Sequence, residues 1–80
     1  MTIKILGSGC PKCQQLEQNA KKAVEELDLK YAQVEHIYDV NKIIEMGIMM
    51  TPAMAIDEKI VSAGKILSVE EIKEIVKQNL

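Results

Sequence analysis

Residues 7–13 read Gly-Ser-Gly-Cys-Pro-Lys-Cys and lie between two segments of different periodicity. Before them, Thr2 to Leu6 alternates and is rich in β-branched residues, which predicts a strand. After them, apolar residues recur at helical spacing, and Pro11 suits the first helical position because its missing N–H is not needed there. We therefore predict a strand, a glycine-containing turn and a helix that begins at Pro11, with Cys10 at its N-cap.

Cys10 and Cys13 are the only two cysteines of the sequence. A disulfide between them would close a very short loop. Because loop-closure entropy grows with loop length, such a bond would constrain the unfolded chain little. In a reducing cytosol a lone C-x-x-C pair indicates redox chemistry or metal binding rather than a structural cross-link.

The predicted helix start gives the two thiols different environments. A thiolate at position 10 would accept hydrogen bonds from the N–H groups of Lys12 and Cys13, and the helix dipole and the Lys12 cation would favour its negative charge. We therefore expect the pKa of Cys10 to lie below about 8.5. Cys13 lies one turn further on, on the apolar face, and is expected to be buried. Cys10 is then the attacking thiol and Cys13 the resolving thiol, with Pro11 stiffening the turn between them.

The remaining segments complete an α/β pattern. A second strand is expected from Tyr31 to Ile37, and Asp39 is a candidate N-cap for the short helix that follows. Strands over Ala53 to Ile56 and Lys59 to Ala63 are predicted to form a hairpin. The last helix is marked by Ser68-x-x-Glu71, the pattern of a capping box.

The predicted order is therefore β-α-β-α-β-β-α, in a single domain over residues 1–80. A right-handed crossover would make the first two strands parallel, and the hairpin would add antiparallel strands. We expect a mixed four-stranded sheet with helices on both faces. Lys4 conflicts with burial of the first strand on both faces, so either one face is thinly covered there or the lysine stem reaches solvent.

Composition excludes several classes of function. The 80 residues carry a net charge of −2 with scattered lysines, which argues against a nucleic-acid surface. There is no Phe or Trp to form a base-stacking platform. No apolar run approaches the 18 or so residues that span a bilayer, and the N-terminus lacks the apolar region of a secretory signal. We expect a cytoplasmic monomer with no membrane partner.

The strand, the C-P-K-C turn and helix, and Thr51-Pro52 ahead of a hairpin and a last helix resemble the minimal thioredoxin/glutaredoxin-like fold. More narrowly, the chain looks like the small redox-active disulfide proteins of archaea and bacteria, over essentially its whole length. The resemblance implies a thiol–disulfide oxidoreductase with Cys10 as nucleophile and Cys13 as resolving thiol. It also implies a cis Pro52 facing the disulfide, and a backbone at Thr51 that receives an extended substrate peptide.

The same resemblance implies which partners and cofactors to expect. The dithiol would exchange electrons with disulfides in partner proteins, without an organic cofactor and without a metal. A thioredoxin-reductase-like flavoenzyme is the implied electron donor. Three features depart from thioredoxin itself: Gly9 replaces a Trp, Pro11-Lys12 replaces Gly-Pro, and the buried acid near the resolving thiol has no counterpart. The glutathione-holding segment of glutaredoxins is replaced by residues 62–65, Ser-Ala-Gly-Lys.

Two other functions stay open at this point. A soft-metal chaperone could hold Cu(I) between the same two thiolates, whereas Zn²⁺ would need more ligands than the sequence provides nearby. A peptide-docking adaptor could use Thr51-Pro52 with little catalysis. Met49 and Met50 are interpreted as loop filler or, alternatively, as an adaptable docking rim beside Thr51. His36 is interpreted as an ordinary strand residue.

Overall fold

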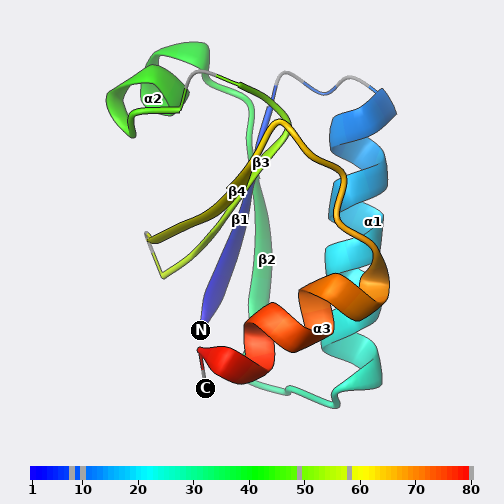
Figure 1. Cartoon of the computed structure of the whole chain (residues 1–80). Helices are drawn as coiled ribbons and strands as arrows, with labels where there is room; N and C mark the ends of the chain where they lie inside the picture. The colour runs from blue at the N-terminus through cyan, green and yellow to red at the C-terminus, as the bar shows by residue number, and fades with distance from the viewer. Residues whose placement is uncertain (8, 10, 49, 58, 80) are drawn as a thin grey trace.

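Within residues 1–7, 9, 11–48, 50–57 and 59–79, which the computed structural model describes, the elements follow the predicted order. They are β1 (Thr2–Leu6), α1 (Pro11–Glu26), β2 (Gln33–Ile37), α2 (Val40–Glu45), β3 (Ala53–Ile56), β4 (Lys59–Ala63) and α3 (Val69–Gln78). Four strands form one mixed sheet in the order β2-β1-β3-β4 (Figure 1). β1 runs parallel to β2 and antiparallel to β3, and β4 is antiparallel to β3. The predicted fold class is confirmed.

α1 and α3 lie side by side on one face of the sheet (Figure 1). The alternation of β1 directs Ile3 and Ile5 to this face, where both are fully buried. Burying one side chain of this size stabilises the fold by roughly 1.5–3 kcal/mol. The members of this main core are Ile3, Ile5, Leu16, Ala20, Ala23, Met54, Ile56, Leu67, Ile72 and Val76.

α2 covers only one end of the opposite face (Figure 1). Asp39 is its N-cap, as predicted, because its carboxylate accepts a hydrogen bond from Asn41 N–H at 2.9 Å. Ile43 packs into a second, smaller cluster with Leu6, Ile48, Ala53 and Ala55. Helices therefore cover both faces, but unequally.

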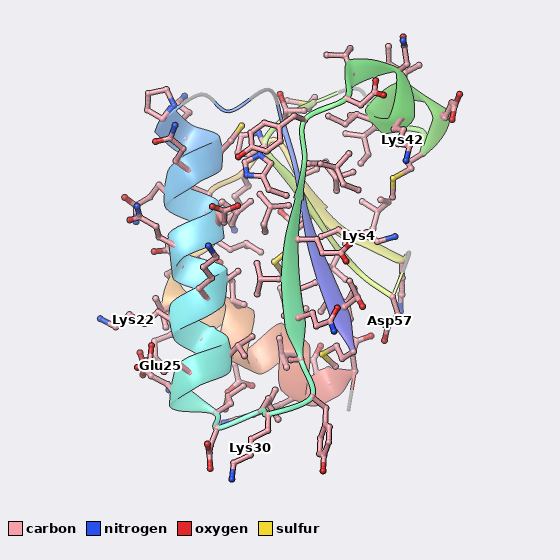
Figure 2. The ribbon with its side chains drawn as sticks, turned by 180° about the vertical axis from the view of Figure 1, so that it is seen from behind. Lys4, Lys22, Glu25, Lys30, Lys42 and Asp57 are labelled. Atoms are coloured by element: carbon pink, nitrogen blue, oxygen red, sulfur yellow. The ribbon has the colours of Figure 1, made fainter. Side chains whose placement is uncertain are left out.

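Lys4 lies on the thinly covered face. Figure 2 shows its side chain pointing away from α1, on the side of the sheet that carries α2. It is half-buried, and its register partner on β2 is Glu35. The conflict raised by a lysine in a central strand is resolved by the short α2, which leaves this half of the face open.

The turn after α1 extends further than the sequence predicts, so β2 begins later than expected. α1 ends at Glu26, and Asp28 adopts a left-handed conformation with φ 53°. The N–H of Leu29 then donates to the carbonyl of Val24 at 3.2 Å, which closes the helix end in the manner of a Schellman motif. β2 begins at Gln33 instead of Tyr31, whose side chain is exposed.

α3 begins with the predicted capping box. Glu71 N–H donates to Ser68 Oγ at 3.1 Å, and Ser68 N–H donates to Glu71 Oε1 at 3.2 Å. The pKa of Glu71 lies below its ordinary value of 4.5 chiefly because its carboxylate accepts the hydrogen bond from the backbone N–H of Ser68. A second contact, with the Lys65 ammonium, lowers it further. Among the described residues, no helix is both long and apolar enough to cross a bilayer.

Candidate active site

The first turn of α1 carries one of the two predicted thiols in a buried position. Because α1 begins at Pro11, Cys10 is the residue directly before the helix in the sequence; Cys10 itself lies outside the described residues. Cys13 is fully buried, as its place on the apolar face predicted. Pro11 and Lys12 are exposed. The helix start thus has an exposed rim and a buried thiol one turn below it.

Gly7 follows β1 and provides the space that the Cys13 thiol occupies. A methyl group added at Gly7 would overlap Cys13 Sγ and would lie 3.9 Å from Cβ of Thr51. The residue is buried, and its N–H donates to the Ile37 carbonyl at 3.1 Å. The end of β1, the first turn of α1 and the segment before β3 therefore meet around a glycine that no larger residue can replace without displacing the thiol.

The Thr51–Pro52 peptide bond is cis, as the resemblance implied. Thr51 is exposed and Pro52 is buried. The Pro52 carbonyl accepts a hydrogen bond from Gly64 N–H at 2.8 Å, which ties this segment to the end of β4. The fold thus places an exposed Thr51 next to Gly7 and, through it, close to Cys13.

Met50 forms the outer edge of this segment. It is 62% exposed, yet it lies over Gly64, where an added methyl group would come within 2.9 Å of its terminal carbon. Gly64 has φ 73°, a conformation that glycine adopts at low cost. Met49, the other residue of the predicted docking rim, lies outside the described residues.

His36, interpreted from the sequence as an ordinary strand residue, makes several contacts with the segments around the start of α1. Its side chain is 4% exposed. Nδ1 lies 2.9 Å from Glu17 Oε1, and Nε2 lies 3.2 Å from the Gly7 carbonyl oxygen. The Tyr38 ring stacks on the imidazole at a centroid distance of 3.9 Å and also packs against Gly9. The His36 imidazole therefore connects β2 and α1 to the segment that leads into the cysteines.

The position of His36 next to the end of β1 could be predicted from the sequence, but its contact with Glu17 could not. Alternation places His36 on the same face as Val34, and the parallel register sets it opposite Ile5, two residues before Gly7. The rotation of α1 that brings Glu17 to the ring is a tertiary feature that periodicity does not fix. Lys21 lies four residues after Glu17 on the same helix, and its ammonium contacts the other carboxylate oxygen at 3.7 Å, so the Glu17 carboxylate contacts both His36 and Lys21.

Among the predicted site residues that the structure describes, Cys13 and Thr51 converge on Gly7, while Pro11 and Lys12 stay on the exposed rim. Within the described part of the chain, no group of three or more His, Cys, Asp or Glu side chains gathers as a metal site. The arrangement is that of a buried thiol at a helix start, near the exposed Thr51.

Comparison with known proteins identifies the family of the chain. A family model described as a thioredoxin domain matches residues 1–77. A protein of Methanocaldococcus jannaschii named thioredoxin is 51% identical over 80 residues, which is 100% of this chain and 91% of the relative. A thioredoxin of Methanothermobacter thermautotrophicus is 43% identical over 75 residues, covering 94% of this chain and 96% of the relative. With the fold, the helix start and the cis proline already in place, the chain belongs to the thioredoxin domain family.

Proposed function

We propose that this thioredoxin-like oxidoreductase exchanges electrons with the disulfides of partner proteins through Cys10 and Cys13. The observation that carries the proposal is the burial of the Cys13 thiol at the start of α1, against Gly7 and beside Thr51. A buried resolving thiol needs a partner thiol at the helix start, and Cys10 is the residue there in the sequence. Relatives named thioredoxin that match nearly the whole chain support the same class of chemistry.

The proposed reaction has two displacement steps. The Cys10 thiolate attacks one sulfur of the substrate disulfide; the substrate S–S bond breaks, and the departing thiolate takes a proton from solvent. Cys13 then loses its proton and attacks the Cys10 sulfur, which forms the Cys10–Cys13 disulfide and releases the second substrate thiol. Overall, the protein dithiol is oxidised by two electrons and the substrate disulfide is reduced to two thiols.

The helix start would favour the thiolate form of Cys10, which is the form that attacks in the first step. The N–H groups of Lys12 and Cys13 lie in the first turn, where a helix has no internal acceptor for them and favours negative charge. A thiolate on Cys10 would use these donors better than a thiol. The exposed Lys12 ammonium adds a smaller contribution, because salt screens it.

A substrate polypeptide would dock on the segment before β3. Thr51 is exposed, and Met50 next to it offers an adaptable apolar side chain. We further propose that a flavoenzyme of the thioredoxin-reductase type returns two electrons to the Cys10–Cys13 disulfide, in the cytoplasm, and that the protein acts as a monomer without a resident metal or organic cofactor.

A redox titration of metal-free protein tests this proposal. The chain is equilibrated in buffers of defined ratio of oxidised to reduced glutathione and then alkylated, and the number of blocked thiols is counted by mass spectrometry. We expect one reversible two-electron transition, in the range of about −270 to −120 mV found for such dithiols. We also expect the reduced protein to accelerate cleavage of insulin disulfides.

The control is the doubly substituted Cys10→Ser, Cys13→Ser protein, which should show neither the transition nor the acceleration. Titration with Cu(I) and Zn²⁺ provides the opposing outcome. Nanomolar metal binding together with no disulfide turnover would overturn the proposal and favour a soft-metal carrier.

A further inference from the structure

His36 makes contacts that an ordinary strand residue does not need. Its backbone belongs to β2, an edge strand, but its side chain is only 4% exposed and turns inward toward α1. Both ring nitrogens meet oxygen atoms: Glu17 Oε1 at 2.9 Å and the Gly7 carbonyl at 3.2 Å. The imidazole is thus buried and contacted at both nitrogens, and one of the contacts is to Gly7, the residue on which the Cys13 thiol packs.

The distances decide which ring nitrogen faces which oxygen: Nε2 meets the Gly7 carbonyl and Nδ1 meets the Glu17 carboxylate. A main-chain carbonyl only accepts hydrogen bonds, so Nε2 must carry the proton that it shares with Gly7. The Glu17 carboxylate, which also contacts Lys21 at 3.7 Å, faces the other nitrogen and orients the ring. The stacked Tyr38 ring closes the outer side. His36 therefore presents a fixed N–H to one carbonyl.

That carbonyl belongs to the residue on which Cys13 packs. Gly7 is held to β2 at both backbone groups: its N–H donates to the Ile37 carbonyl, and its own carbonyl accepts from His36. A Cβ at Gly7 would overlap Cys13 Sγ, so the thiol rests directly on this glycine. Whatever holds Gly7 in place also decides how closely the thiol is enclosed.

We propose that His36 is a positioning residue for the dithiol: through its Nε2–H it holds the Gly7 backbone against Cys13 and thereby keeps the resolving thiol buried. The inference rests on the proposed function only in treating Cys13 as the resolving thiol. Glu17 and Tyr38 act on the same contact by orienting the ring. Without the N–H of His36, the Gly7 carbonyl loses the donor that it has among the described residues, and the segment that packs against the thiol is held less firmly.

Two substitutions separate the hydrogen bond from the packing of the ring. His36→Phe keeps an aromatic ring that can stack on Tyr38 but removes the donor. His36→Gln removes the ring but carries an amide N–H about as far from Cα as Nε2 is. The matched control is Asn19→Ala, which removes another side-chain hydrogen bond to a main-chain carbonyl, from Asn19 Nδ2 to Leu67 at 2.9 Å, away from the thiols.

The first measurement is the alkylation rate of Cys13 with N-ethylmaleimide, in a Cys10→Ser background where it is the remaining thiol. We expect His36→Phe to raise this rate by about tenfold, since loss of the hydrogen bond to the Gly7 carbonyl favours opening of the segment by about that factor. We expect His36→Gln and Asn19→Ala to stay within about twofold of the parent. Equal rates for His36→Phe and the parent, or an equal rise in His36→Gln, would overturn the inference.

The second measurement is the equilibrium constant for forming the Cys10–Cys13 disulfide in glutathione buffers. We expect His36→Phe to lower it by at least about threefold, because a less confined Cys13 has a lower effective concentration toward its partner. A residue with a merely structural role would destabilise the oxidised and reduced forms alike and leave this constant unchanged, as Asn19→Ala should. If the parent protein formed no reversible disulfide, the proposed function would fail, whereas the alkylation experiment would still decide the role of His36.

Discussion

At the scale of single residues, Gly7 is the glycine, of the four in the sequence, where an added Cβ would come closest to another atom. We expect Gly7→Ala to lower the free energy of unfolding by about 1–3 kcal/mol, because its methyl group would overlap Cys13 Sγ. We also expect faster alkylation of Cys13 in the reduced protein. Chemical denaturation and thiol-blocking kinetics measure the two effects.

Gly47→Ala is the matched control for that substitution. Gly47 has φ 81°, and nothing lies within 4 Å of an added Cβ, so the change strains the backbone without touching the thiol. A left-handed alanine costs about 1–2 kcal/mol. Cys13 should therefore react at the parental rate in Gly47→Ala; an increase equal to that in Gly7→Ala would show that general loosening, not the overlap with sulfur, exposes the thiol.

The two cysteines should be functionally unequal. Cys13 is fully buried, so in reduced protein it should be alkylated at least about tenfold more slowly than Cys10. Cys13→Ser should accumulate a mixed disulfide with the substrate protein, since Cys10 attacks but nothing resolves the adduct. Cys10→Ser should accumulate none. Non-reducing gels after exposure to a disulfide substrate distinguish the two variants, and equal alkylation rates for the two thiols would contradict the assignment.

At the scale of elements, the start of α3 gives a pH dependence with a definite sign. The backbone N–H of Ser68 and the Lys65 ammonium lower the pKa of Glu71 from its ordinary 4.5. The stabilisation from a depressed carboxyl pKa is fully present above pH 4.5 and is lost as pH falls through the folded pKa. The free energy of unfolding of the parent should therefore fall more steeply below pH 4.5 than that of Glu71→Gln.

The control for this measurement is Glu74→Gln, which removes an exposed carboxylate from the same helix but not from the cap. It should keep the parental slope of unfolding free energy against pH. A parental slope in Glu71→Gln as well would assign the acid sensitivity to carboxylates outside α3.

The elements were predictable because their signals are local. The capping box of Ser68 and Glu71 and the carboxylate cap at Asp39 are each written within four residues of sequence. The end of α1 carries a weaker local signal, because Asp28, a residue with a Cβ, adopts the left-handed conformation that glycine adopts most readily. β2 begins at Gln33, two residues later than the predicted start at Tyr31.

The candidate site was predictable only in part, for the same physical reason. The burial of Cys13 follows from helix periodicity, and the cis Pro52 was expected from the family resemblance. The contacts of His36 with Glu17 and Gly7 join three segments that are distant in sequence. They depend on how far α1 is rotated over the sheet, which a single sequence does not specify.

At the scale of the whole molecule, the two clusters of buried residues should differ in stability. The main core joins α1, α3 and the sheet, whereas α2 is attached chiefly through Ile43 and the small cluster around Leu6. We expect the amides of α2 to exchange hydrogen faster than those of β1 and α3, because opening α2 exposes little apolar surface. Native-state hydrogen exchange followed by NMR measures this difference.

Substitutions in the two clusters make the comparison quantitative. Ile43→Ala should accelerate exchange mainly in α2, whereas Ile72→Ala, a fully buried position of α3, should lower global stability by about 2–5 kcal/mol and accelerate exchange throughout. Uniform acceleration by both variants would show that the domain opens as a single cooperative unit.

Because α2 covers only one end of its face of the sheet, the positions of β1 should differ in which substitutions they accept. In a library of all single substitutions at this strand, Ile3 and Ile5 should accept almost nothing but aliphatic residues, since both face the main core. Thr2 and Lys4, on the face that α2 leaves open, should accept many polar residues. Leu6, where the small cluster closes over that face, should again accept only apolar ones. Along the five residues of β1, tolerance of polar substitutions should alternate from Thr2 to Ile5 and should be absent at Leu6. The length of α2 therefore determines how many positions of this central strand can vary in sequence.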